Sequence, residues 1–166
     1  MIEGRGAVLR QALRGRPTYG PLRMTLYQLA PSLMVCSDYL HGDLCGVYID
    51  EVETIIIDRR LTLDVKRCVL VHELIHWAYG DAGVCEGKEE RRTRNIAARA
   101  LIDEGAYRSA EIMYEGCGAL IAEELGVTQE VVADYRDYLA RTLIFEGREK
   151  WQDSKTSLFG RSGGCG

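Results

Sequence analysis

One stretch, residues 62–80, limits what this chain can fold into more than any other, because its ends and its interior all indicate one helix. Thr62 can cap the start of that helix, and Gly80 is a residue type at which helices commonly end. The interior is mostly apolar and carries the motif HExxH at residues 72–76. Residues four apart lie on the same face of a helix, so the two histidines of the motif are predicted to point in the same direction.

This motif on a helix indicates a zinc centre. His72 and His76 can place two ring nitrogens about 2.0–2.1 Å from one zinc ion, the usual Zn–N distance. Glu73 is predicted to take a proton from a water molecule whose pKa zinc lowers to about 7. The alternative is that the two histidines only pack in an amphipathic helix. However, the chain has only 3 histidines, and a charge at Glu73 in an apolar helix would be costly without a function or a partner. The sequence therefore predicts His72 and His76 as metal ligands and Glu73 as the catalytic residue.

The third protein ligand that a catalytic zinc usually takes is not in the motif. His41, the remaining histidine, precedes a predicted strand and is interpreted as an exposed loop residue. The helix predicted at 88–103 could pack antiparallel to the one that carries the motif and bring a carboxylate from its start to the metal. Helical periodicity barely distinguishes Glu89 from Glu90 as that carboxylate. Both could instead be solvated acids favoured by the helix dipole. Four acids follow Gly80, the glycine that ends the helix carrying HExxH: Asp81, Glu86, Glu89 and Glu90.

Short apolar stretches before the metal motif predict a small sheet. Residues 24–29 alternate apolar and polar side chains, residues 44–49 are rich in β-formers, and residues 54–57 are β-branched. Their close spacing favours an antiparallel sheet of about three strands, followed by a helical bundle, in an α+β fold. A single domain is expected over residues 1–146, with a disordered tail at 147–166. The helices expected are 8–13, 62–79, 88–103, 106–114, 119–125 and 129–143.

Composition excludes several other classes of protein. The chain of 166 residues has a net charge of −4, whereas general nucleic-acid or membrane-surface binders are usually basic. Its 6 cysteines form no CxxC pair and are expected to be reduced thiols. We find neither a signal peptide nor an apolar run long enough to span a membrane, which predicts a cytoplasmic protein.

Five stretches carry a resemblance to a known family: residues 54–58, 61–63, 67–76, 90–102 and 120–132. They resemble the ImmA/IrrE family of zinc metallopeptidases, in particular its short phage and prophage members. Within residues 90–102, the paired alanines of the family's pattern fall on Ala97 and Ala98, which places the ligand glutamate at Glu90. Thr93 and Arg94 depart from the family's usual Ala and Asp.

The resemblance covers about residues 24–143 and implies a zincin-like domain with zinc held by His72, His76 and Glu90. It also implies an endopeptidase that cleaves a protein partner, typically a transcriptional repressor of a prophage or mobile element. A zinc-containing antirepressor that binds its partner without cutting it fits the same residues.

A helix-turn-helix regulator is a further alternative, because residues 125–128 resemble the turn of that motif. Acids in the helix that follows would repel DNA phosphates, which argues against direct nucleic-acid binding on electrostatic grounds. The sequence leaves open which residue helps zinc to stabilise negative charge on the substrate. The candidates are His41, Tyr79, Tyr107 and Tyr114.

Overall fold

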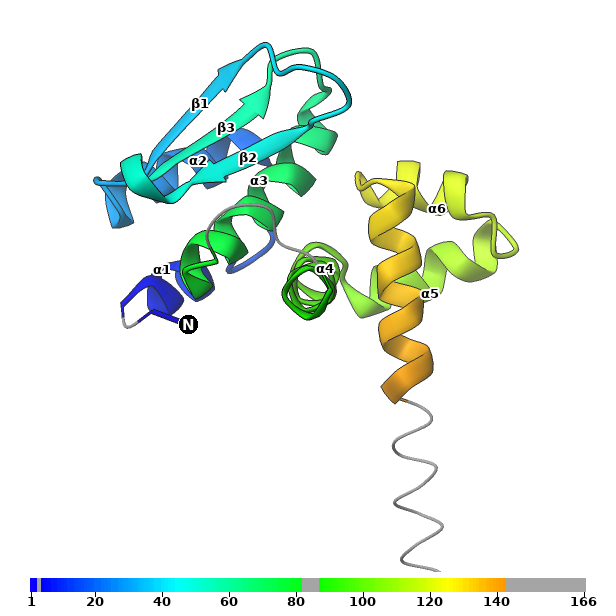
Figure 1. Cartoon of the computed structure of the whole chain (residues 1–166). Coiled ribbons are helices and arrows are strands. Elements are labelled where there is room, and N and C mark those ends of the chain that lie inside the picture. The colour runs from blue at the N-terminus through cyan, green and yellow to red at the C-terminus, as the bar shows by residue number, and fades with distance from the viewer. Residues whose placement is uncertain (3, 82–86, 143–166) are drawn as a thin grey trace, which may run out of the picture.

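The computed structural model describes residues 1–2, 4–81 and 87–142, and it has an α+β architecture in which a three-stranded sheet lies over helix α3 (Figure 1). The predicted tail at 147–166 lies outside the described residues. A final helix occupies residues 129–142. The other elements are α1 (Arg5–Ala12), α2 (Tyr19–Leu29), β1 (Met34–Asp38), β2 (Gly46–Ile49), the 3-10 turn η1 (Asp50–Val52), β3 (Thr54–Asp58), α3 (Leu63–Tyr79), α4 (Lys88–Leu101), α5 (Glu104–Met113) and α6 (Gly118–Leu125).

The sheet has three strands, as predicted, but it is mixed and not antiparallel. Its strand order is β1-β3-β2, with β1 parallel and β2 antiparallel to the central β3. The strands predicted at 44–49 and 54–57 correspond to β2 and β3. The antiparallel prediction was wrong because β1 was not foreseen. From β1 the chain crosses to the far edge of the sheet as β2, and the short turn η1 then returns it to the centre.

The strand predicted at residues 24–29 was also wrong, because these residues form the second half of α2. The buried residues of this helix are Tyr19, Leu22 and Leu26, which have helical spacing and begin before the predicted strand. Pro21 lies in the first turn, where a helix tolerates proline because that backbone N–H has no helical partner.

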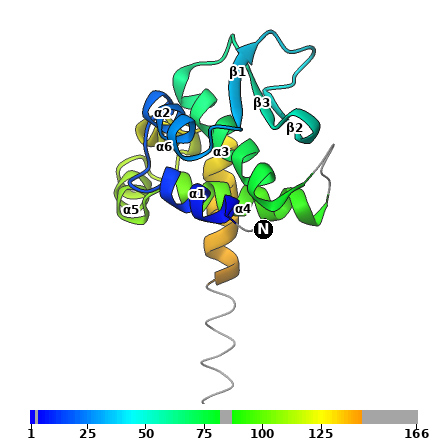
Figure 2. The same ribbon diagram turned by 90° about the vertical axis from the view of Figure 1, so that its left-hand side faces the viewer.

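Helix α3 is the central element of the fold. It packs against β2 and β3 on one side and also contacts α1, α2 and α4 (Figure 1 and Figure 2). Leu70, Leu74 and Ile75 of α3 are fully buried. The predicted ends of this helix are confirmed: the Thr62 hydroxyl caps its first turn, and Gly80 ends it in a left-handed conformation with φ of 72°.

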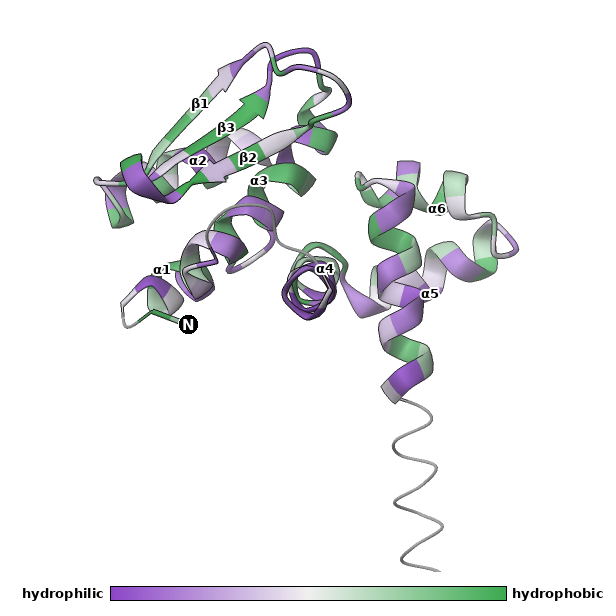
Figure 3. Ribbon diagram, viewed as in Figure 1, coloured by the Kyte–Doolittle hydropathy of each residue, from purple (hydrophilic) through white to green (hydrophobic). Residues whose placement is uncertain are grey.

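The strands present an apolar face to α3. Ile55 and Ile57 of β3 are fully buried, and Figure 3 shows this strand as hydrophobic along most of its length. Because directly opposite residues share a face, Tyr48 and Gly46 of β2 point to the same side as Ile55 and Ile57. Within the described residues, no helix is long and apolar enough to cross a membrane.

Gly46 allows β2 to approach α3 closely. A methyl group on this residue would lie 2.3 Å from Val69 Cγ1 and 3.5 Å from Glu73 Cγ. We expect Gly46→Ala to lower the free energy of unfolding by about 1–3 kcal/mol, because the added atom overfills a packed contact. Denaturant titration would measure this change.

Val69→Ala supplies the control, since it removes the atom that the new methyl group would meet. In the double variant Gly46→Ala/Val69→Ala, the loss should be smaller than the sum of the two single losses. Strictly additive losses would show that this contact does not set the distance between β2 and α3.

Candidate metal centre

Helices α3 and α4 bring three potential metal ligands together. His72 Nε2 and His76 Nε2 lie 3.0 Å apart. Glu90 Oε2 lies 3.4 Å from His72 Nε2 and 3.5 Å from His76 Nε2. Among the described residues, these three are the group of His, Cys, Asp and Glu side chains that could hold a metal ion, with their ligand atoms all within 4.8 Å of one another.

Glu90, and not Glu89, belongs to this group because of how α4 is rotated against α3. The residues that follow Glu90 along one helix face, Thr93, Ala97 and Leu101, are all buried. Glu89 heads the neighbouring line and is exposed. The ambiguity that helical periodicity left is thus resolved in favour of the glutamate on the buried line.

The three donor atoms suit a tetrahedral divalent ion. Bonds of about 2.0–2.1 Å at tetrahedral angles place ligand atoms about 3.3 Å apart. The observed separations of 3.0, 3.4 and 3.5 Å bracket that value. Two imidazole nitrogens and one carboxylate are also a ligand set typical of catalytic zinc, and three protein ligands leave a fourth position open. The residues present therefore fit a zinc ion.

Asp81 fixes the orientation of His76. Its Oδ2 lies 3.1 Å from His76 Nδ1, and because a carboxylate only accepts hydrogen bonds, Nδ1–H donates. The lone pair of the neutral ring is then on Nε2, the atom that faces His72 and Glu90. Arg92 donates a hydrogen bond to the same Asp81 oxygen and lies over the Tyr79 ring, 4.0 Å from its centroid.

The surroundings of the centre favour a neutral His72 and an ionised Asp81. Burial lowers the pKa of His72, an effect that the Glu90 carboxylate opposes. Burial alone would raise the pKa of Asp81, but its hydrogen bonds with Arg92 and His76 outweigh this and lower it. Neutral imidazole is the form that binds metal, so the site is prepared for a cation.

Glu73 lies beside the centre without belonging to the ligand group. Burial raises its pKa to about 7, with the backbone of Tyr48 opposing the shift and Glu90 adding to it. A carboxylate whose pKa lies near the working pH is suited to take a proton and return it. Glu73 is thus a buried carboxyl group beside the candidate ligands, with a pKa at which it can exchange a proton near neutral pH.

A groove of about 860 Å³ is lined by His72, Glu73 and Glu90. Val65 and Val69 of α3 and Gly46 of β2 line the groove. The lining also includes Ala122 of α6, Val127 in the turn after α6, and Val131 of the final helix. The lining thus combines apolar side chains from several elements with the polar groups of the centre.

Several residues considered from the sequence are not brought to this site. Glu86 lies outside the described residues. His41 is exposed in a loop, and Tyr79 lies under Arg92. Tyr107 accepts a hydrogen bond from Arg136, and Tyr114 donates one to Glu124. None of His41, Tyr79, Tyr107 and Tyr114 lines the groove.

The supporting role of Asp81 was missed because the residue was considered only as a possible ligand. A local signal for it exists. Gly80 takes a left-handed conformation, and the Asp81 N–H then donates to the His76 carbonyl at 3.0 Å. This turn returns the Asp81 side chain to the histidine ring one turn earlier.

We expect Asp81→Asn to weaken zinc affinity by about 10–100-fold, the range typical when a residue that orients a ligand histidine is changed. Competition with a chromophoric chelator would measure the loss. Asp137→Asn serves as a charge-matched control on the final helix, where it should leave zinc affinity unchanged. Equal affinity in wild type and Asp81→Asn would show that this carboxylate does not position His76.

The chain was also compared with known proteins. It matches no family model, and no curated protein matches its sequence.

Proposed function

We propose that the protein is a zinc-dependent endopeptidase. The observation that carries this proposal is the triangle of His72 Nε2, His76 Nε2 and Glu90 Oε2, with Glu73 beside it and a groove leading to it. It is supported further by the resemblance of the surrounding sequence to ImmA/IrrE metallopeptidases, whose zincin-like fold we propose for this chain.

The reaction would be hydrolysis of a peptide bond. When bound, a zinc ion would polarise the substrate carbonyl and acidify a water molecule at its open position. Glu73 accepts a proton from the attacking water as its oxygen bonds to the carbonyl carbon. Glu73 then returns the proton to the leaving nitrogen as the C–N bond breaks, giving an amine and a carboxylic acid that loses its own proton to solvent. His72, His76 and Glu90 would hold the ion throughout.

We propose a protein partner as the substrate, since the groove has both apolar and charged lining residues and room for an extended segment. Following the family resemblance, the partner is a transcriptional repressor of a phage or mobile element, cut in the cytoplasm. A zinc-containing antirepressor that binds without cutting uses the same groove and is the second candidate.

The helix-turn-helix interpretation receives less support from the geometry. In that interpretation the final helix would enter the DNA groove, but Asp134 of this helix is bound by Arg94, and Val132 is buried. Glu130 adds an exposed acid at its start. A helix engaged in this way presents acids where DNA binding requires cations.

Cleavage of an unbiased peptide library tests the proposed function with no need to choose a substrate in advance. Zinc-loaded full-length protein would be incubated with peptides derived from a proteome, and new termini would be identified by mass spectrometry. We expect a recurrent cleavage motif that disappears on chelation of the metal. Binding of peptides without new termini would instead support the antirepressor.

Glu90→Gln should weaken zinc retention, because glutamine keeps the shape of the side chain but removes the charge that favours a divalent ion. Glu89→Gln is the matched control, one residue away on the exposed side of α4, and should bind zinc like wild type. Metal analysis after dialysis would distinguish them. Loss of zinc in Glu89→Gln with retention in Glu90→Gln would contradict the ligand assignment.

A further inference from the structure

Arg94 is the single Lys or Arg side chain among the described residues that line the groove beside the metal centre. The other charged side chains of the lining are acids. A substrate entering the groove therefore meets one fixed positive charge in an acidic surrounding. The acids are Glu73, Glu90, Glu123, Glu130 and Asp134.

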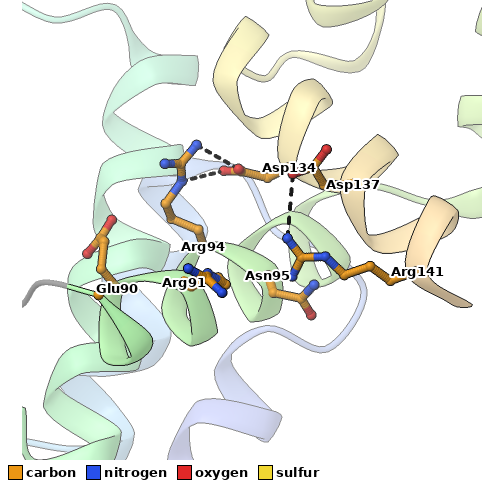
Figure 4. Close-up of a pocket in the computed structure, with 8 residues that line it drawn as sticks. Glu90, Arg91, Arg94, Asn95, Asp134, Asp137 and Arg141 are labelled. Atoms are coloured by element: carbon orange, nitrogen blue, oxygen red, sulfur yellow. Dashed lines mark hydrogen bonds and ion pairs between the residues drawn. The ribbon is translucent and has the colours of Figure 1, made fainter.

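Arg94 lies one helical turn beyond Glu90 on α4, so the two side chains share a face of the helix. Figure 4 shows both rising from the same side of α4, with Arg94 directed toward Asp134 on the final helix. Arg94 lines the same groove as His72, Glu73 and Glu90, so it lies in the space that a substrate at the centre would occupy.

The guanidinium of Arg94 is held by Asp134, and only some of its N–H groups take part in this contact. Its Nε donates to Asp134 Oδ2 at 3.0 Å, and its Nη2 donates to Oδ1 at 2.7 Å. Arginine has five N–H groups, and this paired contact uses two of them. The Arg94 side chain is 47% exposed, and Arg94 lines the groove. The pairing with Asp134 holds the group in one orientation in advance of substrate binding.

Hydrolysis of a peptide bond develops negative charge on the carbonyl oxygen, and a donor placed at that oxygen lowers the barrier. We propose that Arg94 donates a hydrogen bond to the substrate carbonyl oxygen as it becomes negatively charged, while Asp134 holds the guanidinium in place. This inference rests on the proposed peptidase function. Arginine suits the role because it stays protonated at all working pH values.

Two small ligands separate this role from a purely structural ion pair. N-phosphoryl-Leu-Ala carries charged oxygens on a tetrahedral phosphorus that imitate the reacting carbonyl oxygen, whereas the hydroxamate of the same dipeptide chelates zinc through a planar group with no tetrahedral oxyanion. Binding of each would be measured by calorimetry on the zinc-loaded full chain. Arg91→Ala is the matched control, because Arg91 lies on the same helix and does not line the groove.

We expect Arg94→Ala to weaken binding of the phosphoryl dipeptide by about 10–100-fold, the loss of one hydrogen bond between charged groups. Hydroxamate binding should change by less than about threefold, because solvent screens the missing charge. Zinc content should equal that of wild type, and Arg91→Ala should bind both ligands normally.

Equal weakening of both ligands, or a loss in Arg91→Ala that matches the loss in Arg94→Ala, would overturn the role of Arg94 and leave the peptidase proposal standing. Unchanged binding of the phosphoryl dipeptide in Arg94→Ala would also overturn the role of Arg94 without affecting the peptidase proposal. A zinc-loaded wild type that binds neither ligand would contradict the peptidase centre itself.

Discussion

Glu73→Gln is expected to keep zinc and the native fold but to lower the rate of peptide cleavage by about 10²–10⁴, the usual contribution of a general base. An amide cannot accept the proton of the attacking water. The side chain does not belong to the ligand group, so the metal should remain bound. Glutamine has nearly the same shape as glutamate, so the side chain should keep its place beside Gly46 of β2.

The rates would be compared on a peptide carrying the motif found in the library experiment, with zinc content measured on the same samples. The variant should still bind the intact substrate and hold it for longer than wild type does. Undiminished cleavage by Glu73→Gln would remove this residue from the mechanism. A wild type that binds its partner and never cuts it would establish the antirepressor alternative.

The second large expected effect is the loss of zinc when either ligand histidine is removed. His72→Ala and His76→Ala should each lose zinc during purification, because the two ligands that remain hold the ion poorly. The loss of affinity should exceed the roughly 10–100-fold expected when only a supporting residue such as Asp81 is changed. Metal analysis of the purified proteins would show this directly.

His41→Ala is the control for these variants, since it removes the third histidine of the chain from an exposed loop. It should retain one zinc per chain. Circular dichroism of the alanine variants would verify that metal loss does not reflect a lost fold. A zinc content equal to that of wild type in the double variant His72→Ala/His76→Ala would eliminate the proposed centre.

The parts of the structure that could be predicted from the sequence are those with local causes. The ends of α3 follow from Thr62 and Gly80, and the pairing of two histidines follows from the helical repeat. The choice of Glu90 over Glu89 depends on how α4 is rotated about its own axis. The buried residues of α4 set this rotation when the helix packs against α3. The family resemblance supplied the same choice from sequence.

The parts that could not be predicted depend on contacts between distant segments. Met34, the first residue of β1, is 61% exposed, and the strand has no clear alternation that would mark it. Its parallel pairing with β3 follows from the path of the chain and not from any residue in β1. The contact between Arg94 and Asp134 joins residues 40 positions apart, and neither residue type indicates the other.

X-ray absorption at the zinc edge would test the central claim most directly, because it reports which atoms surround the ion. Cys45 and Cys68 line the same groove and are free thiols, so thiolate binding is the real competitor. For the full chain loaded with one zinc, the proposed centre predicts nitrogen and oxygen neighbours at about 2.0–2.1 Å, with the outer scattering typical of two imidazoles. A shell of sulfur at about 2.3 Å, or a spectrum that lacks imidazole, would contradict a centre built from His72, His76 and Glu90.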